Sequence, residues 1–360
     1  MKKSLIALAV LAASGAAMAQ SSVTLYGVAD AGVTYLNGAD NWSGVTSGNN
    51  LTSRLGFRGV EDLGGGLKAN FVIEGGFNLD NGDGASGYAG AKAGEGFQFK
   101  RRSTVGLSGG FGEVRMGREL TAAYNATARY DVFGSVGIGQ SRLWADGGVV
   151  DASANATAVT TNQRISNALT YVSPDFSGFK VGLNYGFGET TTGNSDSGYL
   201  GAGLMYDNGP LSLGLGLERL NSGLNSDAVS DIDAWSLGGS YDFGVAKLLA
   251  GYRVSTVDRA TGENKRSGAY LAATAPVGAG TVRVSYNRYE NELANVKGKA
   301  DQFAIGYVYG LSKRTSVYGT YAYIKNKDGA NLYTLGSSTQ GGLKNNGSQQ
   351  GVQVGVSHAF

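Results

Sequence analysis

The last stretch of the chain, Gly351-Val352-Gln353-Val354-Gly355-Val356-Ser357-His358-Ala359-Phe360, decides the fold. Val352, Val354, Val356, His358 and Phe360 fall on one face, and small or polar residues fall on the other. Strict alternation predicts a β-strand, because successive side chains point to opposite sides of a sheet. An exposed terminal strand ending in Phe would promote aggregation in water. We therefore expect its apolar face to meet lipid and its edge to pair with the first strand, which closes a barrel.

The first 19 residues have the pattern of a secretory signal peptide. Lys2 and Lys3 form a basic region, Leu5–Ala13 form a short apolar core, and Ala17-Met18-Ala19 is a small-x-small cleavage site. The apolar run is too short for the ~20 residues that a membrane-spanning helix needs. We expect an exported chain with a signal peptide at residues 1–19 and one transmembrane β-barrel domain at residues 20–360.

The composition excludes several classes of protein. The chain has 30 basic and 28 acidic residues, and two of the basic ones lie in the signal, so the remainder is near neutral and no nucleic-acid partner is indicated. It has no cysteine, so disulfides cannot stabilise it. Its 60 glycines are far above average usage, and a curved, closed sheet with a crowded lumen and many tight turns would explain them. No apolar stretch after the signal has transmembrane-helix length, so a membrane-spanning form requires a closed barrel.

Short turns and longer polar segments alternate along the chain. The seven short turns are Glu61–Gly65, Ser108–Gly112, Ser173–Gly178, Asp207–Pro210, Asp242–Gly244, Pro276–Gly280 and Gly310–Arg314. The eight longer segments are residues 37–50, 80–95, 119–163, 189–196, 222–230, 258–264, 292–298 and 326–346. Together they join sixteen antiparallel strands, with both termini on the short-turn side, which is typical of outer-membrane barrels. Tyr and Phe collect near the strand ends, as in the aromatic girdles of a lipid-facing band rather than in the core of a soluble sandwich.

One segment, residues 119–163, is far longer than the others, and loops of such length are usually functional or disordered. Its first half contains glycines and the aromatic residues Tyr124, Tyr130, Phe133 and Trp144, a composition that is able to pack. We expect this third outer loop to fold into the barrel and narrow it. A sixteen-stranded barrel is wide enough to leave water inside.

Alternation also predicts which charged side chains reach a water-filled lumen. Leu55 and Phe57 facing lipid place Arg54 and Arg58 inside, and Ile165 and Leu169 facing outward place Arg164 inside. The same reasoning places Lys100, Arg102 and Glu74 inside. Several cations around a narrow aqueous gap raise the local concentration of anions and penalise cations. The alternative is that these arginines only solvate the wall or hold the long loop.

Four motifs resemble a known family. Ser22-Val23-Thr24-Leu25-Tyr26-Gly27, the run Ser53–Lys68, Tyr130-Asp131-Val132-Phe133 and the closing Val356-Ser357-His358-Ala359-Phe360 resemble the general porins of β-proteobacteria, and especially the anion-selective outer-membrane type of the comamonads. The resemblance extends over essentially the whole chain after the signal. It implies a homotrimeric, sixteen-stranded diffusion channel in a Gram-negative outer membrane, in contact with lipid and lipopolysaccharide. Carried to this sequence, it points to Arg101 rather than Arg102 at the constriction, with Glu74 and Asp131 near it; both arginines remain candidates.

These observations predict a channel and not an enzyme. His358 is the only histidine and there is no cysteine, so neither a Ser-His-Asp nor a Cys-His arrangement nor a His/Cys metal site can form. We expect no cofactor and no metal. The expected function is passive diffusion of small hydrophilic solutes, neutral or anionic, with a preference for anions. The alternative is a closed structural or adhesive barrel that binds ligands through its outer loops.

Overall fold

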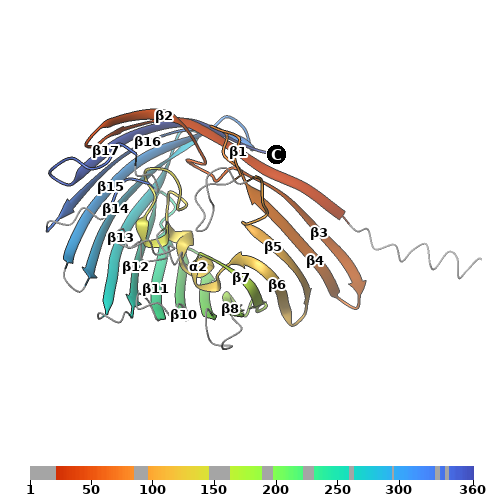
Figure 1. The fold of residues 1–360 in the computed structure, drawn as a ribbon. Helices are drawn as coiled ribbons and strands as arrows, with labels where there is room; N and C mark the ends of the chain where they lie inside the picture. Colours follow the sequence, from red (N-terminus) through yellow and green to blue (C-terminus); the bar gives the residue numbers. More distant parts are fainter. Residues whose placement is uncertain are drawn as a thin grey trace, which may run out of the picture.

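The computed structural model describes residues 22–84, 96–145, 163–188, 198–221, 231–258, 263–293, 296–328, 333–336 and 340–360. The signal peptide predicted at residues 1–19 lies outside them. Most of the described chain forms one antiparallel sheet that closes on itself, with β1 beside β17 (Figure 1). The strands are β1 (Ser22–Asn37), β2 (Asn41–Ser47), β3 (Arg54–Gly64), β4 (Leu67–Gly76), β5 (Arg102–Gly109), β6 (Gly112–Leu120), β7 (Arg164–Val172), β8 (Phe179–Gly186), β9 (Tyr199–Asn208), β10 (Leu211–Asn221), β11 (Asp231–Asp242), β12 (Lys247–Val257), β13 (Asn264–Val277), β14 (Gly280–Leu293), β15 (Val296–Gly310), β16 (Thr315–Lys327) and β17 (Ser348–Ala359).

Seventeen strand segments occupy sixteen positions around this barrel. Residues 22–28 of β1 pair with β3, and residues 31–37 of β1 pair with β2. β2 and β3 therefore share one position, interrupted by residues 48–53. The predicted sixteen-stranded antiparallel barrel is confirmed. The predicted first loop needs a correction, because residues 41–47 of the segment 37–50 form a strand.

Asp30 of β1 accounts for the interruption between β2 and β3. Its buried carboxylate accepts hydrogen bonds from the backbone N–H groups of Asn49 (2.8 Å), Asn50 (3.2 Å) and Leu51 (3.0 Å), and from the Tyr318 hydroxyl (2.8 Å). These bonds satisfy backbone donors that the broken strand would otherwise leave without partners. The chain between the two segments is therefore held against the inner face of β1.

The barrel closes between the first strand and the last strand, as the sequence of the last strand predicts. Val33 lies opposite Val354, and the Phe360 N–H and C=O groups exchange hydrogen bonds with Gly27 (3.1 and 3.0 Å). The side chains of Val352, Val354 and Val356 remain 46–58% exposed on the outer face. The last strand thus presents an apolar outer face and has no open edge along its pairing with β1 and β16.

All seven short turns lie where the sequence predicts them, between successive strand pairs from β3–β4 to β15–β16. Gly64, Gly65 and Gly66 in the first of these turns all have φ between 62° and 85°, a region that L-residues with side chains rarely adopt. The longer connections lie at the other end of the barrel. The segment 292–298 is shorter than expected, because β14 continues to Leu293 and β15 begins at Val296.

The outer face carries apolar side chains with aromatic residues toward both strand ends. On β8, the Phe179 ring packs on Tyr206 (4.3 Å between centroids) beside the short turn, and Tyr185 packs on Phe187 (4.8 Å) at the far end. Leu183, between these two pairs, is 45% exposed. This order matches the aromatic girdles expected of a lipid-facing band. In the part of the chain that the structure describes, no helix has the length and apolar character to cross a membrane.

The long loop folds into the barrel, as predicted. Its described part, residues 121–145, contains α2 (Ala122–Thr127), the 3-10 turn η1 (Ala128–Tyr130) and α3 (Arg142–Ala145), and Figure 1 shows α2 inside the ring of strands. The aromatic residues Tyr130, Phe133 and Trp144 are 1–3% exposed, within one cluster that includes residues of the barrel wall. The rest of the predicted loop, residues 146–162, lies outside the described residues.

Two glycines of the wall, Gly203 and Gly214, lie where the backbone of α2 approaches it closely. A Cβ atom at Gly203 would lie 2.2 Å from the Ala122 carbonyl oxygen, and one at Gly214 would lie 2.0 Å from the Ala126 carbonyl oxygen. Both distances are far inside van der Waals contact. These glycines of β9 and β10 therefore allow α2 to pack directly against the two strands.

Candidate functional site

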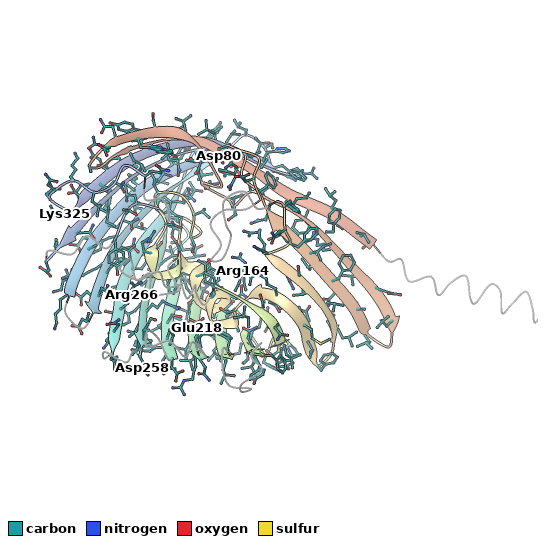
Figure 2. All side chains as sticks on the ribbon, in the orientation of Figure 1. Asp80, Arg164, Glu218, Asp258, Arg266 and Lys325 are labelled. Carbon is teal, nitrogen blue, oxygen red and sulfur yellow. The ribbon has the colours of Figure 1, made fainter. Side chains whose placement is uncertain are left out.

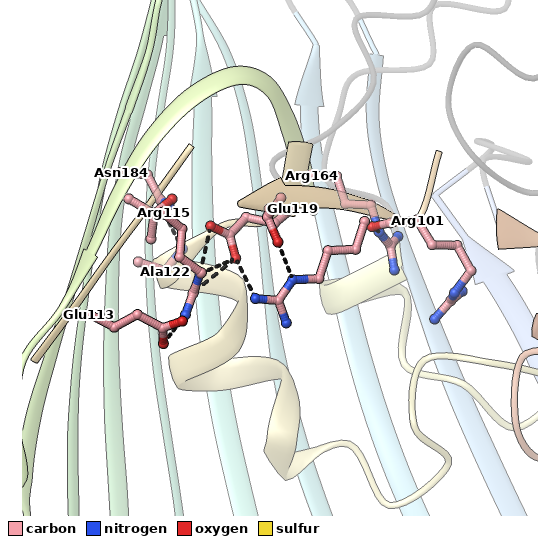
Figure 3. Close-up of polar contacts among 10 residues, drawn as sticks. Arg101, Glu113, Arg115, Glu119, Ala122, Arg164 and Asn184 are labelled. Carbon is pink, nitrogen blue, oxygen red and sulfur yellow. Dashed lines mark hydrogen bonds and ion pairs between the residues drawn. The ribbon is translucent and has the colours of Figure 1, made fainter. Parts of the chain in front are cut away.

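A cavity of about 390 Å³ lies between the long loop and the inner wall of the first strands. Three arginines from different parts of the wall line it: Arg54 at the start of β3, Arg101 just before β5, and Arg164 at the start of β7. Tyr124 and residues 134–138 line it from the loop side. Figure 3 shows Arg101 and Arg164 next to each other above the loop. The cavity therefore has a cationic wall and a loop wall.

Glu74 of β4 fixes two of these arginines. One carboxylate oxygen accepts a hydrogen bond from Arg101 Nε at 2.5 Å, and the other lies 3.8 Å from Arg54 Nε. The Tyr26 hydroxyl donates a third contact to the same carboxylate at 3.0 Å. A charge-assisted pair held by an additional hydrogen bond is well ordered. Glu74 thus positions the cations and offsets part of their charge.

Arg164 reaches the cavity, although the reasoning that placed it there was wrong in one step. Ile165 faces inward, buried against Ala168 and Tyr199, and not outward with Leu169. The cause is a β-bulge in β7: from Ala168 to Ile165 the chain advances three residues while its partner β6 advances two, from Gly117 to Glu119. Asn167, within the bulge, has a φ of 51°. Arg164 is nevertheless held at the cavity by a 3.0 Å bond from its Nε to the Arg101 carbonyl oxygen.

Both candidate arginines before and within β5 point inward. Arg102 lies opposite Glu74 in the β4–β5 ladder, so alternation places it inside, as predicted. Arg101 precedes the strand, and its backbone N–H bonds to the Glu74 carbonyl oxygen (3.1 Å), so the strand alternation does not apply to it. Arg101 lines the cavity, whereas Arg102 approaches Glu119 at 3.8 Å.

The other two predicted basic residues lie around the cavity and not among its described lining residues. Arg58 is exposed on the inner face of β3, with its guanidinium 5.3 Å from the centre of the Tyr26 ring. Lys100 is half-buried, and its backbone carbonyl accepts a 2.6 Å bond from Arg118 Nε. Arg58 adds positive charge to the inner face of β3 beside the cavity.

Asp131 organises the long loop. Its buried carboxylate accepts hydrogen bonds from the N–H groups of Phe133 (2.9 Å), Ser135 (3.0 Å) and Ser141 (3.0 Å), which fold residues 131–141 around it. Burial raises the pKa of Asp131 above its usual range, against the opposing effect of these amides. The structure therefore connects Asp131 to the loop backbone and not to the cavity arginines.

An additional charge network on the wall was missed by the sequence reasoning. Arg115 of β6 lies between Glu113 (2.6 Å) and Glu119 (2.8 Å) (Figure 3). Glu119 also approaches Arg102 at 3.8 Å. Alternation with Val114 and the exposed Met116 would have placed Glu113 and Arg115 inside. Glu119 continues the same alternation along β6, because the extra residue of the bulge lies on β7.

Arg283 of β14 was also missed, although Val282 and Val284 on either side predict that it faces inward. Its Nη1 donates to the Val132 carbonyl oxygen (3.1 Å), and its Nη2 donates to Asn50 Oδ1 (3.0 Å). The same guanidinium lies 4.8 Å from the Phe133 ring centre. Arg283 thus connects the wall, the long loop and the segment between β2 and β3.

Comparison with known proteins agrees with this geometry. Residues 5–329 match the family described as Gram-negative porin. The chain belongs to this family. This porin is 45% identical, over the full length of both chains, to outer membrane porin protein 32 of Delftia acidovorans. It is 33% identical to an outer membrane porin protein of Bordetella pertussis, with 91% of this chain and 95% of that one covered.

The structural comparison gives the same result. This porin superposes on the anion-selective porin from Comamonas acidovorans with a TM-score of 0.82 and 41% identity, covering 95% of this chain and all of the other. The closed barrel, the inward loop and these relatives establish an outer-membrane porin, a channel protein. The described residues contain no group of three or more His, Cys, Asp and Glu side chains placed to hold a metal ion.

Proposed function

We propose that this porin is a homotrimeric general diffusion channel that passes small hydrophilic solutes passively and prefers anions. The observation that carries the proposal is the cavity wall with Arg54, Arg101 and Arg164 facing the loop. Glu74 forms ion pairs with Arg54 and Arg101 and so offsets part of this charge. Such a wall raises the local anion concentration at the narrowest part of the lumen.

The contacts explain how the cations are kept in place without forming a tight binding site. Arg101 is held through its side chain by Glu74 and through its carbonyl oxygen by Arg164. A passing anion meets a fixed positive field and not a closed pocket, so it leaves as readily as it enters. We propose Arg54, Arg101 and Arg164 as the selectivity residues, with Arg58, Lys100 and Arg102 as a surrounding positive field.

The acidic residues have separate roles in this proposal. Glu74 orients Arg101 and Arg54, and Asp131 keeps the loop folded at its working position. Support for an anion preference also comes from the relative with the TM-score of 0.82, which is named as an anion-selective porin. We propose the homotrimer from membership of the family, and a cleaved signal peptide at residues 1–19 from the sequence pattern.

Liposome swelling tests the proposed diffusion. Liposomes that contain the purified porin should swell in isotonic solutions of a neutral pentose, and faster in those of a sugar acid than in those of an amino sugar of similar size. Equal rates for the two charged sugars would contradict the anion preference. No swelling with any sugar would favour the closed adhesive barrel. Chemical cross-linking of the folded porin in detergent tests the trimer.

A further inference from the structure

A second, smaller cavity lies between α3 of the long loop and the wall formed by β12, β13 and β14. Its volume is about 40 Å³, and none of its described lining residues belongs to the main cavity. The residues that line it are Arg142, Leu143, Arg253, Ser255, Arg266, Ser267, Tyr289 and Tyr333. Three of these eight side chains are arginines and none is a carboxylate.

The backbone ladder brings two of the arginines together on the wall. Arg266 of β13 lies opposite Ser255 of β12, and Arg253 lies two residues from Ser255, so both arginines share the inner face (Figure 2 labels Arg266). Arg253 forms a buried ion pair with Glu218 at 2.9 Å. This pair fixes the guanidinium beside the cavity and balances one of the three positive charges.

The third arginine comes from the loop. The backbone N–H of Arg142 in α3 donates to the Tyr289 hydroxyl (3.0 Å), and its side chain donates to the Gly336 carbonyl oxygen. The neighbouring Leu143 packs where a Cβ atom on Gly268 would lie 2.3 Å from it. Leu143 of α3 therefore packs directly against β13, which places Arg142 on the same cavity as Arg253 and Arg266.

A buried amide lies next to one of the lining arginines, although it is not itself a lining residue. Asn291 of β14 lies directly opposite Arg266 and is 1% exposed, and neither its Oδ1 nor its Nδ2 has a hydrogen-bond partner. A buried amide without partners is costly, and it often indicates a water or an ion that completes the site. The cavity exceeds the ~10–15 Å³ that one water needs, and it is too small for a sugar.

We infer that this cavity binds one small anion, either a halide or the carboxylate group of a small solute. The anion accepts hydrogen bonds from the guanidinium groups of Arg142, Arg253 and Arg266. It thereby joins α3 of the long loop to β12 and β13 of the wall. An anion in the site stabilises the inward position of the loop, because its hydrogen bonds connect the loop arginine to the two wall arginines. This site does not depend on the ion preference of the main cavity.

Bromide is a suitable probe, because its anomalous scattering locates it directly in crystals of the complete porin grown in sodium bromide. We expect an anomalous peak among Arg142, Arg253 and Arg266, and its loss in the Arg266→Gln variant. The matched control is Arg288→Gln, since Arg288 is exposed and pairs with Glu290 on the outer surface. Bromide at the main cavity without any peak at the second one would overturn the inference and leave the proposed function standing.

A solution measurement covers the case in which crystals of the variant do not form. The unfolding midpoint of the porin in detergent is followed while bromide replaces a bulky sulfonate at constant ionic strength. Loss of one charge-assisted hydrogen bond should raise the half-saturating bromide concentration on the order of tenfold in Arg266→Gln. Arg288→Gln should match the wild type. The same bromide dependence in all three proteins would contradict the inferred site.

Discussion

Neutralising two arginines of the main cavity should reduce the anion preference of the pore. In the double variant Arg54→Gln and Arg164→Gln, the cavity keeps Arg101, which remains paired with Glu74. Gln retains hydrogen-bonding capacity and similar length, so the wall should stay folded while two positive charges are lost. The expected change is therefore electrostatic and not structural.

The size of the effect follows from Coulomb's law. An ion about 6 Å from one unit charge in water has an interaction of roughly 0.7 kcal/mol, and screening at about 0.1 M salt reduces it to about 0.4 kcal/mol. Two lost charges then weaken anion binding by about 0.8 kcal/mol and favour the cation by the same amount. The anion-to-cation permeability ratio should fall on the order of tenfold.

The assay is the reversal potential of single channels in a planar bilayer under a potassium chloride gradient. The matched control neutralises two outward arginines, Arg219→Gln and Arg288→Gln, which form exposed ion pairs with Asp233 and Glu290. This control should keep the wild-type potential. A double cavity variant with unchanged selectivity and unchanged conductance would refute the assignment of Arg54 and Arg164.

Three further predictions follow from the same contacts. Glu119→Gln removes the carboxylate that faces Arg115 and Arg102, so the anion preference should increase a few-fold in bilayer recordings, while Glu292→Gln at the exposed outer rim should not change it. Gly214→Ala places a Cβ against the Ala126 carbonyl, so the loop should move off the wall. The expected results are a loss of about 1–3 kcal/mol of stability and a lower single-channel conductance. Gly319→Ala, where a Cβ meets open space, is the control, and equal conductance in both variants would count against the packed loop. The raised pKa of Asp131 means that the folded porin binds its proton more tightly than the unfolded chain, so the Asp131 contribution to stability is present below pH 3.8 and is lost as the pH rises through the raised pKa. Unfolding midpoints in detergent between pH 3 and 7 should fall more steeply in the wild type than in Asp131→Asn, because other carboxyl groups titrate in this range in both proteins. Parallel curves would contradict the prediction.

The barrel was predictable from sequence because its determinants are local. Alternation in the last strand, the seven turns and the absence of long apolar runs each depend on neighbouring residues, and the structure confirms them. Arg54 and Glu74 were placed correctly because β3 and β4 are regular where these residues lie. The inward position of the long loop followed from its length and its aromatic residues.

The features that the sequence did not predict depend on local irregularities, and the two-residue alternation of a regular strand does not describe these. The bulge at Asn167 reverses the side on which Ile165 lies, and the break before β5 releases Arg101 from the strand alternation. The fold-back of residues 48–53 depends on one buried carboxylate, Asp30, which pairs with backbone groups about 20 residues away. The second arginine cavity joins α3 to β12 and β13, a contact that no local pattern specifies.

The central claim is that the arginine wall of the main cavity makes this porin prefer anions. The reversal potential of the wild-type channel under a potassium chloride gradient tests it most directly. The account predicts stepwise channel conductance with a potential of the sign given by chloride permeation. A potential of the opposite sign from correctly folded protein would contradict the charge assignment, and the arginines would then serve to hold the wall and the loop.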